Sequence, residues 1–319
     1  MDVITLLGQL LGSTLVFSTA LIFTSLGGIF SERAGVVNIG LEGMMIFGAF
    51  AAGVGTYYAQ DAGLGAAAPW IGILCAVIFG VIGSLIHALA SVTFKADQTI
   101  SGVVINFLAA GLTVYMVKLL FNGSAETPLI SPFHKYAIPV LRDIPILGEG
   151  FFNAYPTSYL ALIMVGIAFY VLYKTPFGLR LRSVGEYPGA ADTLGINVSR
   201  MRYIGVMISG ALAGLGGATL TLTTTSIFSH NTVSGQGFIA IAAMIFGKWN
   251  PVGAFGAAMF FGFSQAIRNY VQMFEWSSHI PQEFIFMIPY VLTIIVLVSA
   301  VGRSHAPAAL GTPYDPSKR

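Results

Sequence analysis

Long apolar runs are the feature that most constrains how this 319-residue chain can fold. A helix needs about 20 mostly apolar residues to cross the hydrocarbon core of a membrane. Runs of this length recur along nearly the whole chain, and charged residues make up only 9% of it. Soluble proteins carry about 25%. The sequence therefore predicts an all-α polytopic membrane protein.

The apolar runs predict about eight full transmembrane helices plus one short or broken segment. The full spans are expected near residues 4–29, 35–58, 70–93, 100–121, 157–173, 203–223, 252–270 and 284–301. The stretch 237–247 is too short for a straight crossing, which favours a half-helix or re-entrant segment. All of them belong to one predicted domain, residues 1–319, in which Gly210, Gly214 and Ala218 have a spacing that lets membrane helices approach closely.

The distribution of Lys and Arg predicts the orientation, because short basic loops stay in the cytoplasm. The loop 174–202 contains five of the 15 basic residues, so we place it inside with the tail 302–319. The loop 122–157, in which acidic residues balance basic ones, is expected outside. The N-terminus is then outside and the C-terminus inside, which requires an odd number of crossings, and eight spans plus the short segment provide it.

Signatures of enzyme and metal sites are missing from the sequence. It contains no HExxH, no GxSxG and no cluster of Cys and His. Its single Gly-Lys pair, Gly247-Lys248, lacks the other residues of a phosphate-binding P-loop. We expect no catalytic residue, metal or cofactor on this chain, so ATP hydrolysis that drove transport would need a separate subunit.

Polar residues interrupt the second apolar run, in SERAGVVNIGLEGMM, residues 31–45. On one continuous helix Asn38 and Glu42 would share a face, and Glu42 would lie about 10 Å into the span. Because lipid disfavours a carboxylate at this depth, Glu42 is expected to face protein or a water-filled path. Glycines in the stretch also allow the helix to break, as in many transporter sites. Pathway lining and simple helix packing both stay open.

A second polar residue lies at a similar depth in the fourth span. The stretch KADQTISGVVINFLAAGLT, residues 95–113, begins with a plausible helix start at Asp97 and places Asn106 near the level of Glu42. Pairing of Asn106 with Glu42 across the two helices would satisfy both groups.

The inside loop contains a short predicted helix in EYPGAADTLGIN, residues 186–197. Pro188 lies near its start, Gly195 is a suitable left-handed cap, and the residues between them favour a helix. Such a helix, flanked by arginines, can dock into a groove of a partner protein. The alternative is a helix held on the membrane surface by lipid headgroups.

These stretches resemble the permease subunits of bacterial ABC importers of the branched-chain amino acid, ribose and nucleoside family. FGLRLRSVGEYPGAADTLGINV and GQGFIAIAAMIFGKWNPVG carry the same resemblance, which extends from about residue 20 to about residue 300. They look most like the nucleoside and simple-sugar branch. The resemblance implies the ABC importer permease fold and a substrate that is a nucleoside or a simple sugar.

The resemblance also implies partners in a bacterial cytoplasmic membrane. These are a cytoplasmic ABC ATPase, which can be a fused tandem and would bind ATP and magnesium, a second and non-identical permease, and a substrate-binding lipoprotein or periplasmic protein. Nucleic acid is not expected. Residues 183–199 would form the coupling helix that inserts into the ATPase; the coupling residues would be Glu186, Ala190, Ala191, Asp192 and Gly195.

Substrate would pass between the two permeases along a path with five candidate lining residues, Asn38, Glu42, Phe47, Asn106 and Gln265. Aromatic faces beside amides would suit a flat base and a hydroxyl-rich ribose. The main alternative is a stand-alone secondary transporter or channel, and a non-transporting scaffold is the third. Ion-coupled transporters typically carry several deep ionisable residues, whereas here Glu42 is essentially the one deep acid, which disfavours ion coupling.

Overall fold

The computed structural model describes residues 3–139, 141–272, 280–281, 283–284, 287, 291, 294 and 305–315. The described helices are α1 Val3–Arg33, α2 Leu41–Asp61, α3 Ala68–Ala88, α4 Gln98–Leu120, α5 Leu147–Phe151, α6 Pro156–Lys174, α7 Pro176–Glu186, α8 Pro188–Thr193, α9 Val198–Thr219, α10 Gln236–Phe246 and α11 Pro251–Val271. The π-helical turns Leu89–Thr93 and Leu220–Thr225 extend α3 and α9, and 3-10 turns cover Gly65–Ala67 and Leu141–Asp143. Strands β1 Tyr136–Ala137 and β2 Asn153–Ala154 pair in an antiparallel ribbon.

Five of the described helices, α1, α3, α4, α6 and α9, are long and apolar enough to cross a membrane. Helices α2 and α11 have 21 residues each, whereas α10 has only 11. An 11-residue helix is about 16 Å long at 1.5 Å per residue, which is too short for a core of about 30 Å. The prediction of an all-helical, multi-pass chain is confirmed. The predicted eighth span, 284–301, lies almost wholly outside the described residues.

The second predicted span was placed too early. Helix α1 continues to Arg33, and α2 begins at Leu41 rather than at residue 35. Between them Gly35 has φ +86°, a left-handed conformation that ends the helix. Asn38 therefore precedes α2, and the prediction that it shares a helix face with Glu42 is wrong.

The predicted inside loop 174–202 is mostly helical. Helix α8 occupies the predicted place, and Gly195 follows it with φ +80°. Helix α7 is not among the predicted elements. Thr175 and Pro176 mark its start in the sequence: the hydroxyl of Thr175 accepts a hydrogen bond from the Gly178 amide (3.2 Å), and Pro176 occupies the first helical position. Helix α9 also begins at Val198, five residues earlier than expected.

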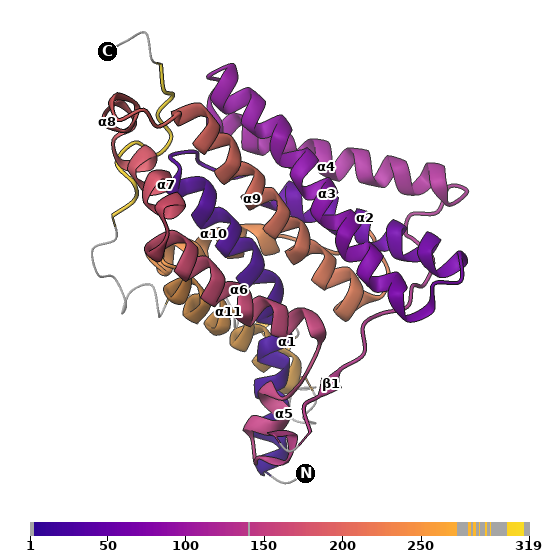
Figure 1. The fold of residues 1–319 in the computed structure, drawn as a ribbon. Helices are drawn as coiled ribbons and strands as arrows, with labels where there is room; N and C mark the ends of the chain where they lie inside the picture. The colour runs from indigo at the N-terminus through magenta and orange to yellow at the C-terminus, as the bar shows by residue number, and fades with distance from the viewer. Residues whose placement is uncertain are drawn as a thin grey trace.

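Helix α9 packs against α1, α2 and α3 (Figure 1). Its small residues permit this approach. A Cβ on Gly210 would collide with the carbonyl oxygen of Gly80, and one on Gly214 with that of Ala76, both on α3. The small-residue spacing on α9 thus marks a backbone-to-backbone contact, as the sequence predicted.

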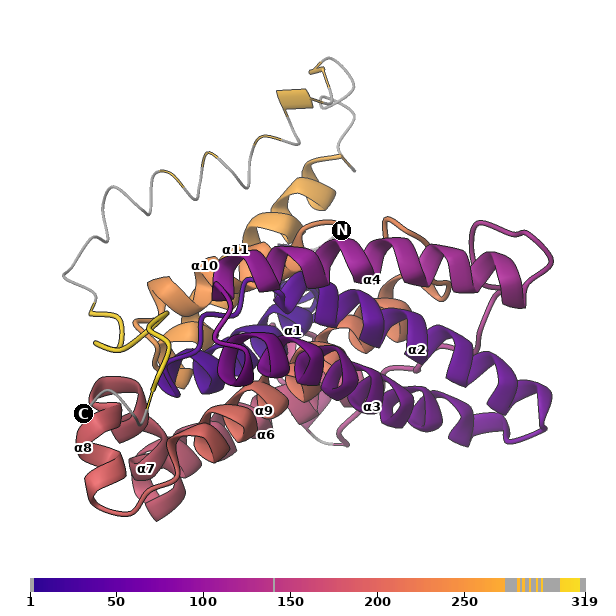
Figure 2. The same ribbon diagram turned by 90° about the horizontal axis from the view of Figure 1, so that it is seen from above.

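The two ends of the bundle differ. Figure 1 shows α7, α8 and the yellow C-terminal residues at one end, and the N-terminus, α5 and β1 at the opposite end. We call these the α8 end and the α5 end. The segment 305–315 lies at the α8 end (Figures 1 and 2), where it contacts α7, α8 and the segment between α1 and α2.

Candidate functional site

The α1–α2 linker, residues 34–40, is non-helical and mostly buried. Backbone polar groups in such a segment must find partners within the protein, because lipid provides none. Two side chains of α4 supply them. The amide of Val37 donates to Oε1 of Gln98 (2.7 Å), and the carbonyl of Ile39 accepts from Nδ2 of Asn106 (3.1 Å). These bonds fix an irregular segment inside the helical bundle.

His87 of α3 holds the same linker from another side. Its Nε2 lies 3.0 Å from the carbonyl oxygen of Val37, and its Nδ1 lies 2.9 Å from Oγ of Ser101. A carbonyl can only accept, so Nε2 carries the proton, and the neutral ring can accept from Ser101 at Nδ1. His87 is fully buried. The sequence does not indicate that His87 and Gln98 bind the linker, because it does not show where the carbonyl and the amide of Val37 lie.

Glu42, in the first turn of α2, is buried and binds the start of α10. Its Oε1 accepts a hydrogen bond from the amide of Gly235 (2.6 Å), and its Oε2 accepts from the amide of Gly237 (2.7 Å). The first amides of a helix have no partner within it and attract negative charge. A carboxylate therefore stabilises the N-terminus of a half-helix that begins inside the protein.

Gln265 of α11 also contacts the start of α10. Its side-chain amide pairs with that of Gln236, the first residue of α10, with Nε2 of Gln236 3.2 Å from Oε1 of Gln265. Glu42 and Gln265, far apart in the sequence, are thus both placed at the start of α10. Two of the five predicted pathway residues therefore meet at this start.

Asn38 belongs to the linker, and Asn106 binds it. Besides its bond to the linker, Asn106 accepts a hydrogen bond at Oδ1 from the amide of Gly43 (2.7 Å). Asn38 is 1% exposed, and its Nδ2 donates to Oγ of Ser209 on α9 (2.9 Å). The predicted pairing of Asn106 with Glu42 is wrong, because each side chain is satisfied by backbone amides that the sequence does not place beside it.

Phe47 lies further along α2 and is buried against α3 and α4. Its ring fills the space that a Cβ on Gly83 would need, and it packs with Ile105 and Ala109. In this conformation the ring is a packing contact between three helices, and the structure does not bring it to Glu42.

The five predicted coupling residues lie in and around α8 at the α8 end: Glu186 ends α7, Ala190, Ala191 and Asp192 belong to α8, and Gly195 follows it. Ala190 and Gly195 are exposed, whereas Ala191 is 2% exposed and packs inward. The side chain of Leu194 beside them is 81% exposed. An exposed apolar side chain on a short helix at the end of the molecule suits docking against another protein.

The two acidic coupling residues bind the C-terminal segment. Oε2 of Glu186 accepts from the amide of Ala308 (3.0 Å), and Oδ2 of Asp192 accepts from the hydroxyl of Tyr314 (2.7 Å). The sequence analysis described residues 302–319 only as a tail, because nothing in a short polar segment indicates which surface it contacts.

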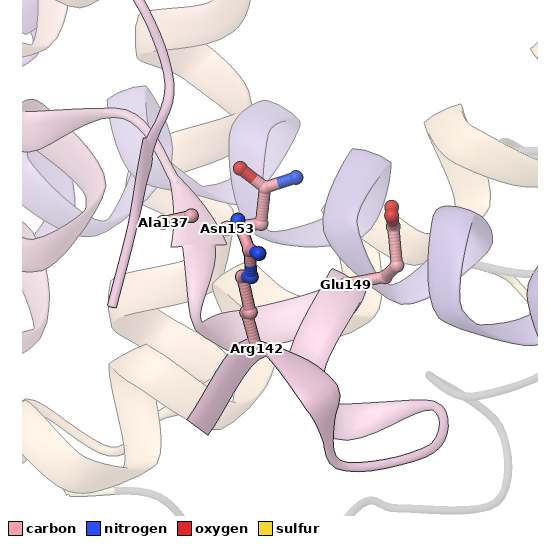
Figure 3. Close-up of a pocket in the computed structure, with 4 residues that line it drawn as sticks. All are labelled: Ala137, Arg142, Glu149 and Asn153. Atoms are coloured by element: carbon pink, nitrogen blue, oxygen red, sulfur yellow. The ribbon is translucent and has the colours of Figure 1, made fainter. Parts of the chain in front are cut away.

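A pocket of about 390 Å³ opens at the α5 end, within the predicted outside loop. Its lining residues are Ala137, Arg142, Glu149 and Asn153. Figure 3 shows the side chain of Arg142 extending toward Asn153, with Glu149 projecting from α5 beside them. The lining carries both charges and an amide, which suits polar contact with another molecule.

Among the residues that the structure describes, no three His, Cys, Asp or Glu side chains form a group that could hold a metal ion. The polar groups of the linker and of the α10 start are buried hydrogen-bonding groups on broken or short helices. In membrane proteins this arrangement is typical of transport sites.

Comparison with known proteins places this arrangement in a family. A family model described as branched-chain amino acid transport system / permease component matches residues 10–297. The chain belongs to this permease family. The permease is therefore a multi-pass membrane protein, and its α10, linker and α8 lie inside the matched region.

Three relatives have the same kind of description. The guanosine ABC transporter permease protein NupQ of Bacillus subtilis (strain 168) is 53% identical to the permease over the full length of both chains. The nucleoside ABC transporter permease protein NupC of Lactococcus lactis subsp. cremoris (strain MG1363) is 43% identical, again over both full lengths. The guanosine ABC transporter permease protein NupP of the same Bacillus strain is 27% identical over 91% of the permease and 80% of its own length.

Proposed function

We propose that this chain is the membrane-spanning subunit of an ATP-driven ABC importer and that it forms the translocation pathway for a nucleoside. One observation carries the proposal: the full-length identity of 53% to a guanosine permease and of 43% to a nucleoside permease. Similarity at this level along the whole chain includes every element of the candidate site. A simple sugar is the alternative substrate.

The importer needs further subunits. The chain has no P-loop, so a cytoplasmic ABC ATPase, single or fused in tandem, would bind ATP and magnesium. NupQ and NupP are both guanosine permease proteins of one bacterium and differ in sequence, which supports a second, non-identical permease beside this one. A substrate-binding lipoprotein or periplasmic protein would deliver the nucleoside.

The orientation follows from charge. The basic loop that contains α7 and α8 would face the cytoplasm, and the α5 end would face outward with the N-terminus. The pocket lined by Arg142, Glu149 and Asn153 then offers a polar surface to the substrate-binding protein. Helix α8 would insert into the ATPase with Ala190, Gly195 and the neighbouring Leu194 exposed toward it.

The five predicted pathway residues would act in two ways. Glu42 and Gln265 hold the start of α10, while Asn38 and Asn106 hold the linker, so four of them position broken backbone beside the path. Phe47 would meet the substrate only if α3 and α4 separate from α2 during transport. Backbone groups freed at such breaks can bind the hydroxyls of a ribose.

The deciding experiment is purification of the tagged chain from its native membrane, followed by uptake of labelled guanosine in cells with and without the gene. An ATPase and a second permease should co-purify, and uptake should require the gene and resist competition by excess glucose. Competition by glucose would establish the sugar importer. Gradient-driven uptake into liposomes by the chain alone would instead establish a secondary transporter.

A further inference from the structure

The C-terminal segment 305–315, which we call the strap, binds both helices of the coupling region. The amide of Ala309 donates to the carbonyl of Gly185 (2.9 Å) at the end of α7. The hydroxyl of Tyr314 donates to Asp192 (2.7 Å) within α8 itself. The strap therefore follows α7 and α8 and does not simply leave the bundle.

The same strap binds the α1–α2 linker and the start of α9. The amide of Gly311 donates to the carbonyl of Gly35 in the linker (3.2 Å). Nη1 of Arg202 on α9 donates to the carbonyl of Thr312 (2.9 Å), and Arg202 is only 1% exposed. A buried guanidinium needs acceptors, and here the strap backbone provides one.

An ion pair also fixes the end of the strap to the segment before α4. Nζ of Lys95 lies 3.0 Å from Oδ2 of Asp315. Lys95 is held in a left-handed turn, φ +54°, just before the Asp97 that starts α4. Helix α4 in turn provides Asn106, which holds the linker from the other side.

The strap, α7 and the linker meet at Gly35. A Cβ at this position would lie 3.4 Å from the carbonyl oxygen of Ala309, 3.4 Å from Cα of Gly185 and 3.1 Å from Nη2 of Arg202. Segments distant in the sequence thus approach one left-handed residue so closely that a side chain there would touch each of them. Because close-packed segments transmit displacement, movement of one must move the others.

We infer that the strap transmits displacement of α8 to the α1–α2 linker, with Tyr314 and Arg202 as its positioning residues. The inference rests on the proposed function, in which an ATPase moves α8. Tyr314 holds the strap to α8, Gly311 holds it to the linker, and the linker leads into α2 and Glu42. The consequence is that ATP hydrolysis and opening of the path depend on residues that touch neither ATP nor substrate.

The test uses the intact importer in liposomes and measures labelled guanosine transported per ATP hydrolysed. Tyr314→Phe removes the hydroxyl that binds Asp192, and a chain ending at residue 304 removes the strap. Both should still co-purify with the ATPase. Tyr314→Phe should lower the ratio about tenfold or more, as expected for one lost hydrogen bond to a carboxylate, and the chain ending at residue 304 should lower it further.

The matched control ends at Asp315, so that it removes residues 316–319 and keeps every strap contact described above; its ratio should equal that of the full chain. An unchanged ratio in Tyr314→Phe overturns the inference, and so does loss of the ATPase from this variant, because the strap would then build the docking surface instead of transmitting motion. If the chain ending at residue 304 does not accumulate in the membrane, the ratio measured for Tyr314→Phe alone tests the inference. Absence of an ATPase from the full chain is a separate result, and it rejects the proposed function.

Discussion

At the residue scale, Glu42 shows why a carboxylate is tolerated within an apolar run. Both of its carboxylate oxygens accept hydrogen bonds from backbone amides at the start of α10. Glu42→Ala would leave these amides without partners, at a cost of about 1–3 kcal/mol each. We expect a clear fall in the melting temperature of the purified protein in detergent, measured by tryptophan fluorescence or by retention of monodisperse protein after heating.

The control for this prediction is Glu126→Ala, which removes an exposed carboxylate in the loop after α4 and should leave the melting temperature unchanged. Equal melting temperatures for Glu42→Ala and the unmodified protein would show that the α10 start does not depend on Glu42. An inactive variant of full stability would then favour a direct role for Glu42 in the pathway.

The sequence predicts that Glu42, Asn38 and Asn106 turn inward, because lipid excludes them, but it does not predict their partners. Two of these side chains bind backbone amides or carbonyls whose positions depend on where helices break and cross. Similar depth in the membrane therefore wrongly predicts that Asn106 and Glu42 bind each other. The binding of His87 to the linker is not predicted for the same reason, since its acceptor is the carbonyl of Val37.

At the element scale, composition and length predicted a multi-pass helical chain, and five described helices are long and apolar enough to cross a membrane, while the count of eight full spans stays a prediction. The errors in the element bounds come from local breaks in the helices. The short apolar run became α10 as expected, since no rearrangement can extend 11 helical residues across a bilayer. The start of α2 was misplaced because Gly35 ends α1 in the middle of a nearly continuous pattern. Helix α7 is not predicted from the sequence because its basic residues are typical of a cytoplasmic loop.

The contact between α9 and α3 gives a test at this scale. Gly214→Ala would place a Cβ against the carbonyl of Ala76 and force the helices apart, which typically costs about 1–3 kcal/mol. The matched change Gly166→Ala on α6 meets open space and should be neutral or raise stability by about 0.5–1 kcal/mol, the gain in helix propensity. Melting temperatures of the two variants should therefore move in different directions; a shared direction would contradict the packing described for α9.

The coupling role of α8 gives a second test. Gly195→Asp adds a charge to the exposed end of α8, where φ is +80°, and should abolish guanosine uptake while the protein stays in the membrane. Gly63→Asp is closely matched, because Gly63 has φ +78°, is also free of neighbours and lies after α2, far from α8 in the sequence. Uptake should survive Gly63→Asp. Survival of uptake in Gly195→Asp would reject the coupling assignment.

At the scale of the whole molecule, the proposed orientation puts the two ends of the bundle on opposite sides of the membrane. In a Cys75→Ala background, we expect an impermeant maleimide to label Ala62→Cys in intact cells. Ser199→Cys, at the start of α9, should be labelled only after the membrane is opened. Both positions are exposed in the structure, so accessibility alone does not separate them. The reverse pattern would invert the orientation.

The strap has a consequence for how the chain is made. Synthesis proceeds from the N-terminus, so residues 305–315 leave the ribosome after α7, α8, α9 and the linker that they bind. Until then Arg202 lacks the carbonyl of Thr312, and Gly35 lacks the amide of Gly311. Under the proposed function, the surface that contacts the ATPase is therefore completed last, and an interrupted chain would carry most of its membrane helices without a finished α8 end.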